Sequence, residues 1–367
     1  MKILEVVFDL RSGGAERFAV DLSNELSKNN DVTLMAIKDD SLEPEIAQFY
    51  KFDLSDRVLY KNLGLPNGYS FRMAWQIYRA IKAEKADIVH IHGYSMPIYC
   101  IMAIYLLNRK MKFYQTIHSD INNRYTSFFY RLLIKTVGYC QRMGFVAISE
   151  TNYSDMMKLY PKIKGACITN GRARVLPTDR FEEVKAEISK YKKNPNSLVY
   201  LHVARCSPIK NQTMLVEAFS KFVDAGYNAD LIIIGAGFDS ELGKSIKALS
   251  GSRIHIIGTR KNVGDYMLNA DVFCLSSKQE GMPITILEAY LAGIPVVSTP
   301  VCGAVDVIVN GDNGVLSESL FLEDYLNALV LSYSQNQKIK ERAMKMKEHN
   351  QYTIETCAKK YIEFFNR

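Results

Sequence analysis

Short runs of Val, Ile and Leu alternate with longer amphipathic stretches along almost the whole chain. Such runs are typical of parallel strands that are buried on both faces, and the stretches between them are typical of crossover helices. The pattern therefore predicts an α/β fold. Strands are expected at 3–8, 32–37, 88–92, 113–117, 145–148 and 166–169, with helices between them, for example at 16–28 and 73–83.

The strand pattern starts again in the second half of the chain. A chain of 367 residues is long enough for two cores, because single cores stop growing at about 250–300 residues. The segment 170–196 contains two prolines and a charged helical run, which is typical of a domain boundary. The second series of strands is expected at 198–203, 231–234, 254–257, 272–275 and 295–298.

We place the join near Arg174, which predicts one Rossmann-like domain at 1–174 and a second at 175–351. The tail is expected to be helical, and its last helix, at about 352–367, is expected to pack back on the first domain.

Cysteine usage and the amino-terminal sequence indicate the compartment. The seven cysteines form no C-x-x-C pair, so neither a disulfide framework nor a zinc site is expected. Met1 leads directly into a strand, without the regions of a signal peptide. The apolar stretch 94–107 is shorter than the roughly 20 residues of a spanning helix, and we interpret it as a buried core helix. A cytoplasmic protein is expected.

The net charge of +7 is concentrated in the first half of the chain. Between Arg72 and Arg142, 11 basic residues stand against three acidic ones, which favours an anionic partner. The segment 128–135 mixes aromatic and basic residues, as helices at membrane surfaces do. Peripheral association with the inner face of an anionic membrane and a core helix with solvated cations both remain open. Nucleic acid is not expected as a partner.

Two glycines follow the first strand. Gly13 and Gly14 permit a tight turn, and the helix that starts there offers backbone N–H groups to an anion. The spacing is not G-x-G-x-x-G, so the dinucleotide fingerprint is absent. An ordinary tight turn remains an equal alternative.

Two cations follow the first strand of the second half. Arg205 stands at the carboxyl end of that strand and Lys210 near the start of the next helix. Ligands of open α/β sheets bind at these strand ends. A guanidinium and an ammonium group can together neutralise the charge that develops on a leaving diphosphate. Solvated surface cations are the alternative interpretation.

Two carboxylates flank the start of a later helix. Glu280 and Glu288 are separated by seven residues, with Pro283 suited to the first helical turn and Gly293 to the helix end. Such a pair can reach two different sugars of one nucleotide-sugar. Gly281 leaves the backbone open to ligand oxygens.

Taken in order, these segments resemble the family-4-type retaining glycosyltransferases of the GT-B fold (glycosyl transferases group 1). The resemblance spans nearly the whole chain. One departure is at Gly303 to Asp306, where the family often has Gly-Gly and a glutamate, and this leaves the role of Asp306 open. The matching segments are Gly13-Gly14-Ala15-Glu16, His118, Asn170-Gly171, Arg205 with Lys210-Asn211, Asp271-Val272-Phe273, Glu280 to Glu288, Pro295-Val296-Val297-Ser298 and Asn313-Gly314.

The resemblance implies two Rossmann-like domains that face a central cleft and hold a nucleoside diphosphate sugar. Arg205 and Lys210 would bind the diphosphate, Glu288 the ribose, and Glu280 the transferring sugar. His118 would act on the sugar or acceptor side, and Gly13 and Gly14 would approach the phosphates or the acceptor. The remaining donor-binding residues would be Gly281, Met282, Pro283, Ile284 and Thr285.

Further expectations concern metals, histidines and the acceptor. The second half contains no D-x-D element at a strand end, so neither a metal nor any other cofactor is expected. His90 and His92 share one face of a strand, and either packing or a place on the acceptor side is open to them. The family's range suggests a saccharide or lipid-linked acceptor in the synthesis of a bacterial capsule, O-antigen or exopolysaccharide.

Three other functions are compatible with the architecture. A nicotinamide-dependent oxidoreductase is disfavoured by the missing glycine fingerprint. A nucleotide-sugar epimerase and a non-catalytic nucleotide-sugar-binding subunit remain alternatives.

Overall fold

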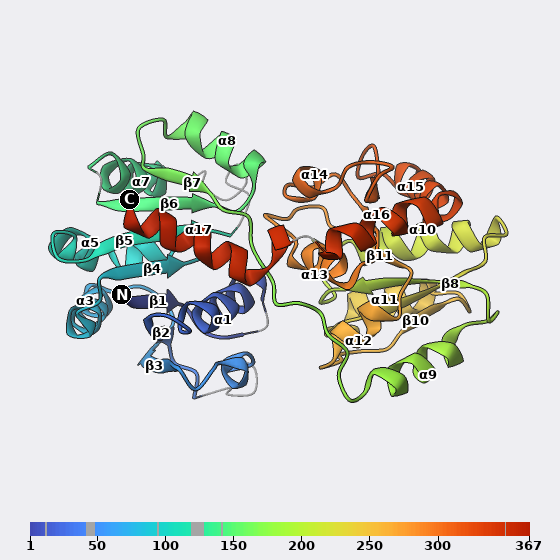
Figure 1. The fold of residues 1–367 in the computed structure, drawn as a ribbon, viewed down its shortest axis with the longest axis horizontal. Coiled ribbons are helices and arrows are strands. Elements are labelled where there is room, and N and C mark those ends of the chain that lie inside the picture. Colours follow the sequence, from blue (N-terminus) through green and yellow to red (C-terminus); the bar gives the residue numbers. More distant parts are fainter. Residues whose placement is uncertain (12, 42–47, 94, 119–127, 141, 349) are drawn as a thin grey trace. The chain divides into compact units, whose positions relative to one another are not determined.

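The computed structural model describes residues 1–11, 13–41, 48–93, 95–118, 128–140, 142–348 and 350–367 (Figure 1). The chain forms two compact units. Unit 1 comprises Met1–Ala173 and Gln351–Arg367, and unit 2 comprises Arg174–Asn350. The chain passes between the units beside Arg174, and its last residues return to unit 1.

Unit 1 is built on a sheet of parallel strands in the order β3-β2-β1-β4-β5-β6-β7. The order reverses beside β1, as it does in doubly wound sheets. The inner strands are almost fully buried, which explains their near-continuous apolar sequences. The strands are β1 (Lys2–Val7), β2 (Asp31–Lys38), β3 (Val58–Leu65), β4 (Ile88–His92), β5 (Lys112–Ile117), β6 (Met143–Ala147) and β7 (Gly165–Cys167).

Helices cover both faces of this sheet. On one face, α3, α5 and α7 pack on alternate strand residues such as Leu4, Val89 and Phe113. On the other face lie α1 and the last helix, α17, which contact each other. Thr353 caps α17 by accepting a hydrogen bond from the backbone of Thr356 at 3.4 Å. The helices are α1 (Gly14–Leu26), α3 (Phe71–Glu84), α4 (Met96–Tyr99), α5 (Ile101–Leu107), α7 (Phe128–Tyr139), α8 (Glu150–Leu159) and α17 (Ile354–Asn366), with the 3-10 turn η1 (Lys51–Asp53).

Unit 2 repeats the plan with a parallel sheet in the order β10-β9-β8-β11-β12-β13. Its core lies between the sheet and the helices α10, α11, α15 and α16, around Tyr200, Phe219 and Phe222. The strands are β8 (Leu198–Val203), β9 (Ala229–Ile234), β10 (Ile254–Ile256), β11 (Val272–Leu275), β12 (Val296–Ser298) and β13 (Gly314–Leu316).

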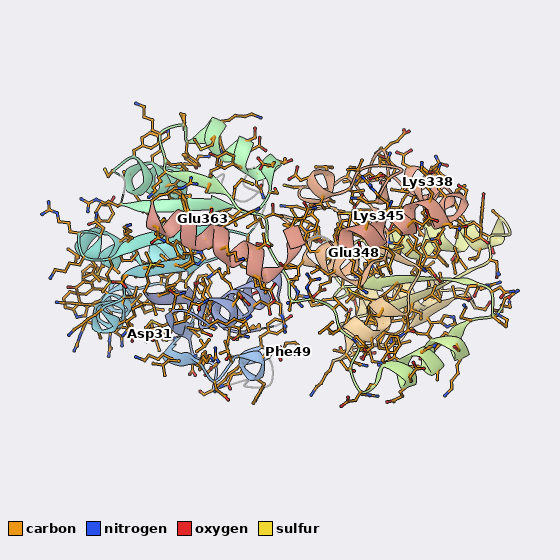
Figure 2. All side chains as sticks on the ribbon, in the orientation of Figure 1. Asp31, Phe49, Lys338, Lys345, Glu348 and Glu363 are labelled. Atoms are coloured by element: carbon orange, nitrogen blue, oxygen red, sulfur yellow. The ribbon has the colours of Figure 1, made fainter. Side chains whose placement is uncertain are left out.

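The helices of unit 2 cover both faces of its sheet. The exposed face of α16 carries charged side chains such as Lys338, Lys345 and Glu348 (Figure 2). The helices are α9 (Phe181–Tyr191), α10 (Gln212–Asp224), α11 (Glu241–Leu249), α12 (Val263–Leu268), α13 (Ile284–Ala292), α14 (Ala304–Val307), α15 (Leu322–Ser334) and α16 (Asn336–Glu348), and the 3-10 turn η2 (Asn350–Tyr352) leads back to unit 1.

The prediction of one buried helix at 94–107 is wrong. Tyr94 lies outside the described residues, and the rest forms α4 and α5, which are separated at Cys100 by a backbone conformation outside the helical region. Tyr105 and Leu106 of α5 are exposed. The apolar sequence there reflects a helix with one buried face and apolar residues on its outer face as well.

Two strands have no counterpart in the expected series, and both lie at a sheet edge. β3 has Lys61, Asn62 and Gly64 in its sequence and pairs with β2 alone. β13 is three residues long and pairs with β12 alone. β3 is only partly buried, and β13 is buried but too short to form an apolar run by which inner strands are recognised. None of the helices in the described ranges combines the length and apolarity needed to cross a bilayer.

Candidate functional site

The two predicted cations of unit 2 lie on the loop between β8 and α10. The loop is held on one side by β9, because Cys206 N–H donates to Ala236 O at 2.8 Å. On the other side Gln212, the first residue of α10, donates through Nε2 to Arg205 O at 3.0 Å. Asn211 turns the chain into the helix with a left-handed φ of 54°. The loop thus has a defined path, and the Arg205 side chain is exposed on it.

Lys210 and Glu280 are in direct contact. The Lys210 Nζ lies 2.6 Å from Glu280 Oε1, and Ser277 donates to the same oxygen at 2.6 Å. Their side chains are 30% and 14% exposed, so the pair lies at the surface, within reach of a ligand. Ser276 connects the two loops further, because its hydroxyl donates to Lys210 O at 2.8 Å.

The segment after Glu280 leads into α13. Gly281, Met282 and Pro283 are buried, and Ile284 begins the helix. Gly303, whose φ is +75°, lies so close that a Cβ there would overlap Gly281 O and contact Met282 Cα. The residue before α14 must therefore be small and left-handed, which only glycine satisfies readily.

The half-exposed face of α13 carries the remaining predicted donor residues. Ile284, Thr285 and Glu288 all lie on it, and Glu288 is little more than one turn beyond the helix start. β8 and β11 are neighbours in a parallel sheet, so the elements that follow them rise from one edge. The structure places Arg205, Lys210, Glu280 and Glu288 on those elements, and joins Lys210 to Glu280 directly.

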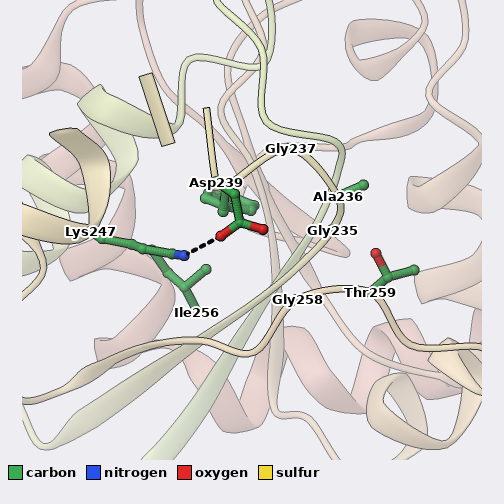
Figure 3. Close-up of a pocket in the computed structure, with 9 residues that line it drawn as sticks. Gly235, Ala236, Gly237, Asp239, Lys247, Ile256, Gly258 and Thr259 are labelled. Carbon is green, nitrogen blue, oxygen red and sulfur yellow. Dashed lines mark hydrogen bonds and ion pairs between the residues drawn. The ribbon is translucent and has the colours of Figure 1, made fainter. Parts of the chain in front are cut away.

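A pocket of about 220 Å³ opens at the carboxyl ends of β9 and β10 (Figure 3). Gly235 packs so tightly on Ala204 O that a Cβ would overlap it, so the pocket adjoins the loop of Arg205. Lys247 and Asp239 pair at 3.0 Å at its side. The sequence interpretation missed this pocket, although glycines directly after two predicted strands could have indicated it. Its lining residues are Gly235, Ala236, Gly237, Phe238, Asp239, Lys247, Ile256, Gly258 and Thr259.

In unit 1, the turn after β1 carries the two predicted glycines. Gly13 is the N-cap of α1 and Gly14 is its first residue, while Ser12 lies outside the described residues. A Cβ on Gly13 would overlap the carboxylate of Glu16. Burial raises the pKa of Glu16. The glycine therefore makes room for the acidic side chain that returns to the start of the helix.

His118, the residue after β5, belongs to a cluster of histidines that is mostly buried. His92 Nδ1 lies 3.0 Å from His118 Nε2, and His92 Nε2 lies 2.6 Å from Glu5 Oε2. His90 Nδ1 lies 2.8 Å from the same oxygen without a hydrogen-bond partner of its own. On its other side, His90 Nε2 is 2.7 Å from the hydroxyl of Thr116.

Burial controls the charges of this cluster. Burial alone would raise the pKa of Glu5, but the contacts with His90 and His92 outweigh it and hold the pKa at about 2. Burial and the neighbouring His90 lower the pKa of His92 to about 4, although Glu5 opposes them. Burial, with His92 and His90, also lowers the pKa of His118 well below its usual value. At neutral pH the cluster holds the Glu5 carboxylate and neutral imidazoles at His92 and His118.

Glu5, His90 and His92 are residue types that can bind a metal ion. Among the described residues they are the group of three carboxylate, imidazole or thiol side chains whose ligand atoms lie within 4.8 Å of one another. Two ligand atoms on one tetrahedral zinc ion are about 3.3 Å apart, because the bonds are about 2.0–2.1 Å long. The 2.6 and 2.8 Å separations are shorter than two ligand atoms on one zinc ion allow, and the 2.6 Å contact of His92 with Glu5 is a hydrogen bond.

The basic stretch of unit 1 lies largely on α3, on α7 and on the turn that follows α5. Exposed aromatic and aliphatic side chains stand among its cations, for example Phe71 and Trp75 on α3 and Leu132 on α7. Arg124 of the stretch lies outside the described residues. The described cations that are exposed beside them are Arg72, Arg79, Lys82, Arg109, Lys110, Arg131 and Lys135.

Two family models match the chain, one in each unit. Residues 12–174 match the model described as Glycosyltransferase Family 4. Residues 183–351 match the model described as Glycosyl transferases group 1. Together the two matches span nearly the whole chain.

Similar proteins include two bacterial transferases. The UDP-Gal:alpha-D-GlcNAc-diphosphoundecaprenol alpha-1,3-galactosyltransferase of Escherichia coli is 27% identical over 69% of this chain and 68% of its own length. A Campylobacter jejuni alpha-1,4-N-acetyl-D-galactosaminyltransferase, named for a PP-undecaprenol-linked acceptor, is 24% identical over 86% of this chain and 84% of its own. Anabaena HepE, solved with UDP and glucose, shares the fold with a TM-score of 0.80 and 17% identity over 100% of this chain and 99% of its own.

Proposed function

Because the chain belongs to the group 1 glycosyl transferases, with a family 4 unit at its amino-terminal end, we propose that it transfers a sugar from a nucleoside diphosphate donor. The acceptor is a saccharide or a lipid-linked saccharide, and the product belongs to a bacterial surface polysaccharide. The E. coli and C. jejuni relatives are named for lipid-diphosphate-linked acceptors, and the Anabaena structure contains UDP.

The observation that carries this proposal is the contact between Lys210 and Glu280 beside Arg205. A carboxylate accepts hydrogen bonds from sugar hydroxyls, and two cations neutralise a diphosphate. The contact at 2.6 Å brings the predicted sugar ligand and the predicted diphosphate ligand together at the start of α13. A bound diphosphate would contact Lys210 while Lys210 remains in contact with Glu280. The negative charge that grows on the leaving diphosphate would strengthen its contact with Lys210.

The pocket beside Gly235 suits the nucleoside of the donor. It adjoins the Arg205 loop, and the glycines among its lining residues leave room for a planar base. Glu288 on the outer face of α13 would accept hydrogen bonds from ribose hydroxyls, as acidic residues do in dinucleotide sites.

The reaction is proposed to retain the anomeric configuration and to need no metal. The bond from the anomeric carbon to the diphosphate oxygen breaks, and the acceptor oxygen bonds to that carbon on the same face. The acceptor's proton passes to the leaving diphosphate. Arg205 and Lys210 supply the positive charge that a divalent cation would otherwise supply.

The test is a transfer assay with a panel of nucleoside diphosphate sugars and a lipid-linked saccharide acceptor. We expect nucleoside diphosphate release that depends on the acceptor, a product with the donor's anomeric configuration, and an unchanged rate in the presence of a chelator. Isomerisation of the donor without acceptor would favour an epimerase and contradict the proposal. Binding of donor without any turnover would indicate a non-catalytic subunit, and rescue of a chelated enzyme by a divalent ion would contradict metal independence.

The face of α3, α5 and α7 is proposed to contact an anionic membrane, where a lipid-linked acceptor would be presented. Exposed cations gain roughly 1 kcal/mol each near such a surface, and Phe71, Trp75 and Leu132 offer apolar area to it. Sedimentation with vesicles should require anionic lipid and should weaken in Arg79→Glu/Lys82→Glu. The matched control is Lys338→Glu, on α16 of unit 2 (Figure 2). Equal binding to neutral vesicles would contradict the membrane role.

A further inference from the structure

The cluster around Glu5 forms a line of side chains across three neighbouring strands. Glu5 on β1 is the Cα partner of His90 on β4, and His92, two residues on, faces the same side of the sheet. His118 follows β5, the next strand. The line runs from Glu5 Oε2 to His92 Nε2 at 2.6 Å and from His92 Nδ1 to His118 Nε2 at 3.0 Å.

The charge of Glu5 determines where the protons lie. An ionised carboxylate can only accept hydrogen bonds, so the proton between Glu5 and His92 must be on His92 Nε2. A neutral imidazole carries one N–H, so His92 Nδ1 must carry a lone pair and accept a hydrogen bond. His118 Nε2 must then carry the proton between the two histidines, which leaves the lone pair of His118 on Nδ1.

Side chains from α1 and α17 pack around the line. Phe18 of α1 packs edge-on against both rings, with centroid distances of 6.1 Å to His92 and 5.5 Å to His118. From α17, Tyr361 lies 2.8 Å from the Thr116 hydroxyl, which in turn contacts His90.

Among the residues that the structure describes, few titratable groups face the line. They are His90 from β4 and Tyr361 from α17, with Cys357 and Cys167 as electrostatic neighbours of Tyr361. Burial raises the pKa of Tyr361 well above its usual value, so the tyrosine remains a neutral donor. Glu5 remains an ionised carboxylate beside these neighbours at neutral pH.

We propose that Glu5 and His92 are positioning residues that hold His118 in its Nε2–H form, so that His118 Nδ1 accepts a hydrogen bond from a hydroxyl of the sugar substrate. This inference rests on the proposed function. In this form, His118 recognises a group that donates a hydrogen bond. A sugar hydroxyl can donate one, whereas an ionised phosphate oxygen can only accept one. His118 is partly exposed, whereas Glu5 and His92 are 0% and 2% exposed.

The first test reads the proton positions directly. The chain has six histidines, so single substitutions can assign them in ¹⁵N-histidine NMR spectra of the full-length protein. We expect His118 as the Nε2–H tautomer, and a mixture of tautomers in Glu5→Gln, because an amide can donate as well as accept. The control is Glu363→Gln, an exposed carboxylate on α17 (Figure 2). An Nδ1–H tautomer in the wild type, or no change in a folded Glu5→Gln protein, would overturn the assignment.

The second test asks what His118 does for the substrate. The short amide side chain in His118→Asn places an acceptor near the position of Nδ1, whereas the longer side chain in His118→Gln places its amide near Nε2.

We expect His118→Asn to retain roughly tenfold more kcat/KM than His118→Gln, and Glu5→Gln to lose roughly tenfold with an altered pH profile. Equal losses in the two His118 variants would overturn the acceptor role. A wild-type protein that transfers no sugar would contradict the proposed function instead, and the NMR result would still decide the tautomer.

Discussion

Unit 1 and unit 2 each hold a carboxylate in contact with nitrogen donors, but at different levels of their sheets. In unit 2, Glu280 meets Lys210 on elements that follow β8 and β11, and both side chains are partly exposed. In unit 1, Glu5 and His92 lie within β1 and β4 and are buried beneath α1 and α17. The partly exposed carboxylate of unit 2 can therefore contact a ligand. The buried carboxylate of unit 1 instead determines which nitrogen atoms of its neighbours carry protons.

Position along a strand explains this difference. A side chain after the carboxyl end of a strand can turn toward a ligand, whereas a side chain within an inner strand is enclosed by helices. Lys210 keeps its charge at the surface. Burial lowers the pKa values of His92 and His118 in unit 1, because charging them without water is costly.

Low pH should produce the largest difference in stability between the two units. The folded-state pKa of His92, about 4, lies below its ordinary value of 6.5. Unfolded chains therefore take up protons that folded chains refuse, and stability falls as pH decreases from 6.5 to 4. The shift corresponds to about 3 kcal/mol for His92, and His118 adds to it in the same direction.

Among the described residues of unit 2, burial lowers the pKa of His202 to about 4 and also lowers that of the partly buried His255. We expect unit 1 to unfold first in urea at pH 4.5, and the two units to unfold closer together at pH 7. The single tryptophan, Trp75, lies on α3 and reports on unit 1, while far-UV ellipticity reports on both. Coincident transitions shifted equally by acid would remove this contrast.

Removing a cation of the exposed site should reduce activity and leave stability nearly unchanged. Arg205→Ala and Lys210→Ala should each remove roughly 2–4 kcal/mol of transition-state stabilisation, which lowers kcat/KM by about 30- to 800-fold. The free energy of unfolding, measured in urea, should change by about 1 kcal/mol or less, since partly exposed ion pairs contribute little to stability. Lys338→Ala is the control. Wild-type turnover in either variant would refute its role at the diphosphate.

Gly303→Ala tests whether the close packing on Gly281 supports the exposed site. The φ of +75° and the overlap with Gly281 O should together cost roughly 2 kcal/mol of stability. Gly226→Ala is the matched control, because its φ is +95° and no atom lies within 4 Å of an added Cβ. Nucleoside diphosphate affinity, measured by calorimetry, should fall in Gly303→Ala alone, and equal effects in both variants would refute the packing argument.

Glu288→Ala should have the smallest effect. Loss of a charged hydrogen bond to the ribose should weaken donor binding about tenfold, with kcat less affected. Glu348→Ala on α16 is the control (Figure 2). An unaltered donor dissociation constant would exclude the ribose role.

Sequence patterns were most informative where burial was uniform. The inner strands of both sheets were expected, because strands covered on both faces are continuous apolar runs. β3 was missed, because an edge strand needs no such run. The helix predicted at 94–107 failed, because apolar composition alone does not distinguish a buried side chain from an exposed one such as Leu106.

For the candidate site, the sequence predicted which residues take part but not which of them contact one another. The positions of Lys210 and Glu280 after their strands followed from strand and helix signals, while Ser277, which donates to Glu280, carried no signal of its own. His90 and His92 were expected to share a face, but nothing in the spacing pointed to Glu5, 87 residues before His92.

By itself, the sequence determined the α/β class, the two series of strands and the chemistry available at the strand ends, because local periodicity and residue type depend on near neighbours in the chain. Only the tertiary structure decided which distant groups meet. The pairing of Lys210 with Glu280, the pocket beside Gly235 and the line from Glu5 to His118 depend on strand order and side-chain packing. These contacts join residues far apart in the chain, and their geometry follows from the way the sheet and its helices enclose them.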